Sequence, residues 1–172
     1  MKSFLTVLCL LLLGLWLGAA IFFGAAVAPN LFGVLRDASL TNANELAGSI
    51  VTRLLAIINR GGFEIALFVI VVRFFGERNQ KMLMRVVEML SLAILAMMAG
   101  VSQWVISPKM LALRTAMRMP IDQVAVSDPR RVAFDSLHQY SVDVMGVALV
   151  AALIAFVMIA LTIVRSPTVR EG

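Results

Sequence analysis

The sequence is poor in the residues on which most metalloproteins and nucleophilic enzymes depend. Its 172 residues include one cysteine, Cys9, and one histidine, His138, and only 15% are charged. A single cysteine excludes an internal disulfide, a cysteine-based metal cluster and a CxxC redox pair. The chain also has no GxGxxG, Walker, HExxH or GxSxG motif that would indicate nucleotide use or nucleophilic catalysis. The sequence leaves enzymatic activity open and favours its absence, and it predicts no catalytic residue and no cofactor.

Apolar residues are abundant instead. They make up 61% of the chain, and the mean hydropathy is +0.96, whereas soluble domains contain roughly 45–50% apolar residues. The 15 Lys and Arg residues outnumber the 10 Asp and Glu residues. They lie between apolar runs, which fits lipid headgroups better than nucleic acid. We therefore expect an integral membrane protein whose partner is the lipid bilayer and not a nucleic acid.

Four apolar segments are long enough to cross a bilayer, since each crossing takes about 20 residues. The predicted spans cover residues 4–28, 54–75, 86–107 and 142–164. Pro29 and Pro108 follow the first and third spans, and we expect these helices to end at the prolines. The second span must include Asn59, Arg60 and Glu64, and the Arg60–Glu64 spacing places the two charges on one helical face. The prediction is an all-α integral membrane protein, a bundle of four transmembrane helices in a single domain over residues 1–172.

An internal repeat divides the chain. Pro29 and Pro108 are 79 residues apart, and the same offset aligns Asn59 with His138 and places an acid, Glu64, opposite Asp143. We interpret the repeat as two tandem helical hairpins. Two-span repeats keep one orientation, so their pseudo-twofold axis runs along the membrane normal. The matched polar residues then lie at similar depth, which predicts a polar pocket between the hairpins.

The candidate ligand- or ion-binding residues are Asn59, Glu64, His138 and Asp143, and the secondary candidates are Arg60, Asp135 and Ser141. Helical spacing places Asp135 and Ser141 within reach of His138. The imidazole then either accepts a proton or ligand, oriented by the carboxylate, or is an inert interfacial cap.

The intramembrane acids also have two interpretations. Glu64 and Asp143 are relays or cation ligands, or acids that favour helix N-termini. A metal site would need His138 with Asp135 and Asp143, and its occupant is unknown. Near the other end of the bundle, Glu88 follows Arg85 by three residues and is predicted to pair with it.

Small residues and loop charges suggest a partner and an orientation. The Gly14-xxx-Gly18 spacing favours close helix contact, inside the bundle or in a homodimer. The positive loop between Arg73 and Arg85, with Lys2 and Arg165, favours both termini in the cytoplasm. We expect a multi-pass protein of a bacterial inner membrane.

Three short stretches carry a resemblance. They are Phe22-Phe23-Gly24 with Ala28-Pro29 and Phe32; Ser107-Pro108-Lys109-Met110 with Arg114; and Phe134 with Leu137-His138 and Ser141. With them the chain resembles the transmembrane protein 205-like family, whose bacterial members are described as domain of unknown function 4149. The resemblance implies a four-span membrane protein of unassigned activity. Its matching positions, to which the family assigns no proven role, are Pro29, Phe32, Pro108, Arg114, Phe134 and His138.

Three functional hypotheses remain open. The first is a small transporter, channel-like subunit or export-associated protein that uses Glu64, His138 and Asp143, with Asn59 as a neutral partner. The second is a membrane scaffold or assembly subunit that binds through Gly14 and Gly18. The third is a membrane enzyme in which His138 holds haem or a metal. The ligand and its direction of movement are not specified by the sequence.

Overall fold

The computed structural model describes residues 2–76 and 81–164, and this part of the chain consists of helices joined by short turns. The elements are α1 (Lys2–Phe22), η1 (Phe23–Val27), α2 (Ala28–Asp37), α3 (Ala43–Phe75), α4 (Met82–Val101), η2 (Ser102–Ile106), α5 (Ser107–Met117), η3 (Ile121–Gln123) and α6 (Pro129–Val164). Segments η1 and η2 are π-helical, and η3 is a single 3₁₀ turn. Four continuous helices, Phe4–Asp37, Ala43–Phe75, Met82–Met117 and Pro129–Val164, are long and apolar enough to cross a membrane. The prediction of an all-α bundle of four membrane-spanning helices is confirmed.

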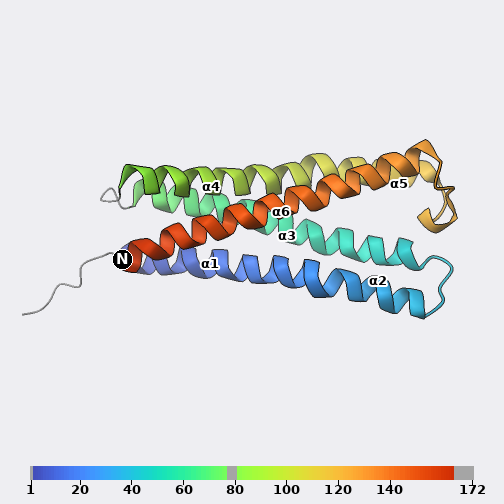
Figure 1. Ribbon diagram of the computed structural model, residues 1–172, viewed down its shortest axis with the longest axis horizontal. Helices are drawn as coiled ribbons and strands as arrows, with labels where there is room; N and C mark the ends of the chain where they lie inside the picture. The colour runs from blue at the N-terminus through green and yellow to red at the C-terminus, as the bar shows by residue number, and fades with distance from the viewer. Residues whose placement is uncertain (1, 77–80, 165–172) are drawn as a thin grey trace, which may run out of the picture.

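The helices form one elongated bundle (Figure 1). The first hairpin is α1–α2 with α3, and the second is α4–α5 with α6. Both α1 and α4 lie against α3 and α6, so each hairpin packs on the other. The core is formed by large side chains of α1, α3, α4 and α6 packed on small ones, among them Leu13, Val69, Leu95, Ala152 and Ile159. Alanines such as Ala152 let α6 approach its neighbours closely, as is typical of helices packed in lipid.

The expectation that the first and third helices end at Pro29 and Pro108 is wrong. Each helix passes through a π-helical turn immediately before the proline and then continues. The backbone N–H of Ala28 donates to the carbonyl of Phe23, and that of Ser107 donates to Ser102, both five residues back. A proline ring clashes with the carbonyl four residues before it in a regular α-helix. The wider π turn displaces that carbonyl, so the helix absorbs the proline instead of ending.

The two π-helical segments are related by the same 79-residue offset as the sequence repeat. Phe23 and Ser102, which begin them, and Val27 and Ile106, which end them, are each 79 residues apart. The correspondence does not extend to the start of the second helices, because α3 begins at Ala43 and α6 at Pro129, 86 residues later. The repeated unit is thus the first helix of each hairpin with its π turn and proline.

A row of polar contacts joins the hairpins along one face of α3, and we call it the interhairpin seam. Glu45, Asn59 and Arg73 are 14 residues apart, close to four helical turns, and so share a face of α3. Their partners on the second hairpin are, in order, Arg114, Ser102 and Glu88.

The prediction that Glu88 pairs with Arg85 is wrong. Arg73 holds both carboxylate oxygens of Glu88, at 2.6 and 3.0 Å. Arg85 instead donates to the carbonyl of Phe74. Spacing along one helix suggested the local pair, but Glu88 lies on the buried face of α4, where α3 supplies the cation.

Candidate functional site

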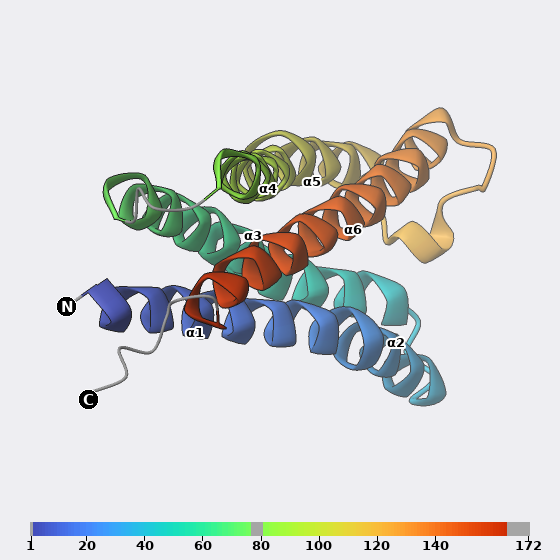
Figure 2. The same cartoon turned by 60° about the vertical axis from the view of Figure 1, so that its left-hand side comes forward.

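A cavity of about 280 Å³ lies between the hairpins, on the far side of the π-helical segments from the start of α1 and the end of α6. We call it the interhairpin pocket. At this end α2 lies beside α3, and α5 lies with the first turns of α6 (Figure 2). Its apolar lining includes Phe32, Val51, Leu55, Met110, Leu111 and Phe134. Its polar lining includes Asn44, Thr52, Ser107, Arg114, Asp122, Arg131, Asp135, His138 and Ser141.

Arg114 reaches from α5 across to α3. Its Nε lies 3.5 Å from Oε1 of Glu45, and its Nη1 donates to the hydroxyl of Ser49 at 3.4 Å. The guanidinium carbon also stands 5.5 Å from the ring centroid of Phe134, within cation–π range. A Cβ at residue Gly48 would come within 2.5 Å of Nη2, so the absence of a side chain there makes room for the guanidinium. The site depends on this arginine to connect its two walls.

Arg131 holds the loop that covers the pocket. Its Nη1 donates to the carbonyls of Ile121 and Val124, at 3.2 and 2.5 Å, and its Nε lies 3.9 Å from Oδ2 of Asp135. A further bridge, from the amide of Asn44 to Asp122, joins the same loop to α3. Within residues 2–76 and 81–164, the Nε atoms of Arg114 and Arg131 are buried without a hydrogen-bond partner. The two guanidiniums therefore have neighbouring acids, but unused donor capacity.

The helix that carries Arg131, Asp135 and His138 begins with a strong cap. Oδ1 of Asp128 accepts from the backbone N–H of Arg130 at 2.8 Å, and Oδ2 accepts from the Arg130 guanidinium at 2.6 Å. The hydrogen bond from the Arg130 side chain is the main cause that lowers the pKa of Asp128 to about 2. Asp128 directly precedes Pro129, the first residue of α6.

The structure brings part of the predicted site together. Asp135, His138 and Ser141 all line the interhairpin pocket, on successive turns of α6. The Ser141 side chain is buried, whereas His138 and Asp135 are exposed. The helical spacing on which the prediction of these three residues rests is present, because α6 runs through all of them.

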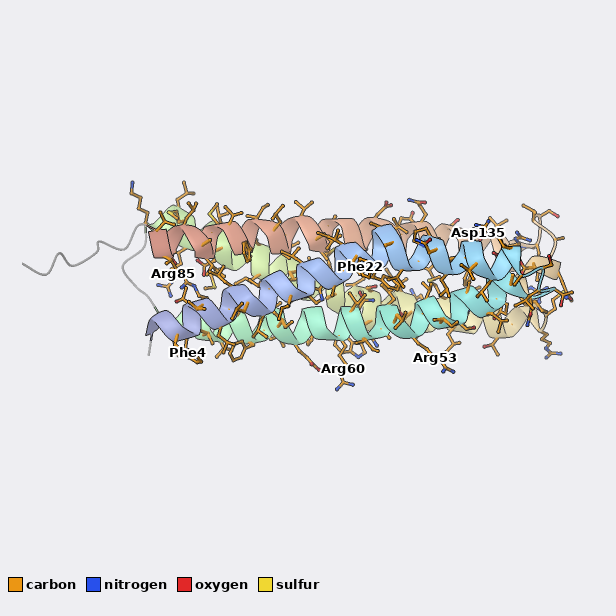
Figure 3. All side chains as sticks on the ribbon, turned by 90° about the horizontal axis from the view of Figure 1, so that it is seen from below. Phe4, Phe22, Arg53, Arg60, Arg85 and Asp135 are labelled. Carbon is orange, nitrogen blue, oxygen red and sulfur yellow. The ribbon has the colours of Figure 1, made fainter. Side chains whose placement is uncertain are left out.

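The other candidates lie elsewhere. Asn59 is buried in the interhairpin seam, where its amide donates to Ser102 at 2.8 Å. Arg60 and Glu64 form the expected pair at 2.9 Å, but their side chains are 71% and 61% exposed, and Figure 3 shows Arg60 projecting away from the bundle. Asp143 is exposed and accepts from Gln139 at 3.2 Å. None of the four is among the residues that line the pocket.

Six polar lining residues were not proposed from the sequence as binding residues, namely Asn44, Thr52, Ser107, Arg114, Asp122 and Arg131. Arg114 carried a signal, because it is one of the positions on which the family resemblance rests. Asp122 reaches the pocket through the fold of the connection after α5, where it meets Asn44 at the start of α3, and no spacing along one helix reveals that.

In the described part of the chain, no group of three or more His, Cys, Asp or Glu side chains is arranged to hold a metal ion. His138 and Asp135 thus have no third ligand of these types beside them there.

The comparisons with known proteins give one match. The family model described as "Domain of unknown function (DUF4149)" matches residues 11–118. These residues run from α1 to the end of α5 and include both π-helical segments and both prolines. No curated protein and no solved structure matches the chain.

Proposed function

The chain belongs to the DUF4149 family, and from this premise we propose that it is a membrane protein that binds a small ligand between its hairpins. Moving that ligand across the membrane, or handing it on for export, would make it a small transporter, a channel-like protein or an export-associated protein. The observation that carries the proposal is the interhairpin pocket, in which ionisable side chains of the second hairpin face uncharged polar and apolar side chains of the first.

The position of the pocket supports this function. The lining residues nearest the membrane interior lie at the ends of the second, third and fourth predicted spans. They are Leu55, Ser107 and Ser141. Ligand sites in helix bundles lie between the helices, and this pocket lies where the predicted spans end. Both first helices reach the pocket through a π turn, a distortion that is frequent at functional sites.

The proposal also covers the proteins to which the chain is related and its orientation in the membrane. We propose that the resemblance extends to the transmembrane protein 205-like proteins; Pro29, Phe32, Pro108 and Arg114 fall within the matched residues, and His138 lies beyond them. For the membrane, we propose the bacterial inner membrane with both termini in the cytoplasm.

The charge argument for this orientation changes with the fold. Arg73 is buried against Glu88 and no longer counts as a loop charge. Arg165 lies outside the described residues, and Arg85 stays at that end of the bundle. Reporter fusions at the two termini test the orientation, and opposite locations of the two reporters would refute it.

Flux through proteoliposomes tests transport. We expect the purified protein to conduct a small cation such as K⁺ or H⁺, with a rate that changes when a pH gradient is imposed. Leu111→Trp fills the pocket from α5 and should abolish the flux. Leu83→Trp is the matched control, since Leu83 is an exposed leucine of α4 that does not line the pocket. Flux no greater than in protein-free vesicles contradicts transport.

A scaffold that assembles through α1 is the second candidate. Gly18 is exposed, and a Cβ there would meet no atom within 4 Å, so its face is open to another helix. Gly14 instead faces α6, where a Cβ would contact Phe156 at 3.4 Å. A homodimer through this face predicts that Gly18→Leu lowers cross-linking between copies, and unchanged cross-linking refutes it.

A further inference from the structure

The walls of the interhairpin pocket differ in chemistry, and from them we propose that its ligand is an amphiphile whose polar end carries an anionic phosphate and a primary amine. This is the chemistry of a phosphatidylethanolamine headgroup. The inference rests on the proposed function only in placing a ligand in this pocket. It does not require that the protein moves the ligand.

The amphiphilic part follows from how the lining is graded along the bundle. Toward the predicted spans the lining is uncharged and is formed by Leu55 and Met110 with the hydroxyls of Ser107 and Ser141. Toward the connecting loop it carries the charges of Asp122 and Arg131. A molecule with an apolar and a polar end satisfies both parts of the lining at once, whereas a purely polar solute would leave the apolar part unused.

The polar end follows from the charges. The rim presents two guanidiniums, Arg114 and Arg131, and two carboxylates, Asp122 and Asp135. The separations of 3.5 Å between Arg114 and Glu45 and 3.9 Å between Arg131 and Asp135 are longer than the 2.6 Å of the buried Arg73–Glu88 pair. Among the described residues, Nη2 of neither arginine donates a hydrogen bond, whereas Nη1 of each already does. These Nη2 groups are the donors that the rim keeps for a ligand, because the Nε atoms are buried.

Asp122 adds an acceptor, because the neighbour that the structure gives it is the neutral amide of Asn44. An anion without an amine would leave Asp122 and Asp135 without a partner, and a cation without a phosphate would leave the two arginines without one. A polar end that carries both charges pairs with both sets.

The size of the cavity sets how much of the ligand enters. About 280 Å³ holds the equivalent of about nine water molecules, at roughly 30 Å³ each. That is room for a phosphoethanolamine group and the first apolar carbons beyond it, which would contact the apolar lining, and not for whole acyl chains. The chains would leave along α2, which has no buried residue and contributes Phe32 to the lining, and along the exposed Leu111 of α5.

Lipid selectivity of the full chain tests the inference. Purified protein is equilibrated in mixed micelles with equal amounts of dioleoyl phosphatidylethanolamine, phosphatidylglycerol and phosphatidylcholine, and the lipid retained after repurification is quantified by mass spectrometry. We expect enrichment of phosphatidylethanolamine of about tenfold, because phosphatidylglycerol lacks the amine and the methylated amine of phosphatidylcholine cannot donate hydrogen bonds. Equal retention of the three lipids overturns the inference.

A second arm separates a lipid from a soluble source of the same group. Free phosphoethanolamine should displace the lipid only at concentrations far above those at which the lipid itself competes. Displacement by both at the same concentration would show that the apolar lining contributes nothing, and it overturns the amphiphilic part.

Variants locate the selectivity in the pocket. Asp122→Asn with Asp135→Asn removes the two carboxylates with little change in size, and we expect retention of phosphatidylethanolamine to fall to that of phosphatidylglycerol. Asp143→Asn is the matched control, an exposed aspartate of α6 outside the pocket, and should retain the preference. Selectivity that survives the double substitution overturns the assignment.

If the double variant does not fold, Asp135→Asn alone serves, because that side chain is 59% exposed. If the protein retains phosphatidylethanolamine selectively but shows no flux, transport is refuted and the proposed ligand is supported. If it shows flux but no selective retention, transport is supported and the proposed ligand is refuted.

Discussion

Arg73 and Glu88 form a buried ion pair inside the bundle, with side chains only 4% and 2% exposed. A single charge in such a place is costly, because neither water nor lipid compensates it. The guanidinium meets both carboxylate oxygens, so the two charges satisfy each other. This pair joins the hairpins at the end of the bundle opposite the interhairpin pocket.

Replacing Glu88 should therefore be strongly destabilising. We expect Glu88→Gln to lower the free energy of unfolding by about 3–5 kcal/mol, because Arg73 loses its carboxylate while remaining buried. Unfolding of the purified protein in one fixed detergent measures the change. Asp135→Asn is the control, since the partly exposed Arg131–Asp135 pair lies outside the predicted spans and is worth only about 0–1 kcal/mol. Equal losses in the two variants would contradict the argument.

Two adjacent glycines of α3 test how closely the Trp16 side chain of α1 packs on α3. A Cβ on Gly62 would come within 2.7–2.8 Å of the Trp16 indole, whereas a Cβ on Gly61 would meet nothing within 4 Å. Trp16 also donates from Nε1 to the carbonyl of Ile58 at 2.8 Å, so it cannot move away without losing that bond. Gly62→Ala should cost about 1–3 kcal/mol and Gly61→Ala should cost nothing, as judged by unfolding in detergent. A Gly61→Ala loss as large as that of Gly62→Ala would refute the close approach.

The low pKa of Asp128 predicts that the stability of the folded protein depends on pH. Arg130 holds the pKa of Asp128 at about 2, below its ordinary 3.8, so the charged carboxylate stabilises the folded state above pH 3.8. That contribution is lost as the pH falls toward 2, where the folded state also becomes protonated. The difference in stability between the wild-type protein and Asp128→Asn should be constant above pH 5 and should shrink between pH 4 and pH 2. A difference that grows as the pH falls would contradict the cap.

At the scale of the elements, the two helical extensions beyond the prolines differ in how they are held. No residue of α2 is buried, and its packing partner is α3. The extension α5 buries Met117 against Val124 and Phe134 and also lies on α6. Local stability follows such packing.

Hydrogen exchange should show this difference. In the reconstituted protein we expect the backbone amides of α2 to exchange faster than those of α5, because opening α2 exposes little apolar surface. Mass spectrometry of peptides covering 28–37 and 107–117 measures both in one experiment, with α1 as the protected reference. Equal protection of the two would show that something other than the described packing holds α2.

The number and placement of the helices were predictable from the sequence, because four apolar runs of sufficient length admit few other arrangements in a bilayer. The ends of the helices were not predictable, because a proline ends a helix only when the turn before it cannot widen into a π-helical turn. At Pro29 and Pro108 it does widen, and nothing in the apolar stretches before them announces a π turn.

At the scale of the whole molecule, the sequence predicted a pocket between the hairpins but only part of its lining. Asp135, His138 and Ser141 were found because helical spacing relates them to one another. Asn59 and Glu64 lie outside the pocket because the 79-residue offset does not hold for the second helices, which begin 86 residues apart. Asn59 does face the second hairpin, but deeper in the bundle, at Ser102, and Glu64 is exposed. The lining from Asp122 and Arg131 depends on the folded connection after α5.

The interhairpin seam restricts how the two halves of the molecule can move against each other. Sliding one hairpin along the other by a helical turn, about 5.4 Å, would part Arg73 from Glu88, Asn59 from Ser102 and Arg114 from Glu45 together. Tilting separates only the contacts far from the pivot. The tightest pair, at 2.6 Å, is Arg73–Glu88, and the loosest, at 3.5 Å, is Arg114–Glu45 beside the pocket. The motion that the seam resists least is therefore a tilt about the buried ion pair, which separates the hairpins at the pocket and leaves Arg73 and Glu88 in contact.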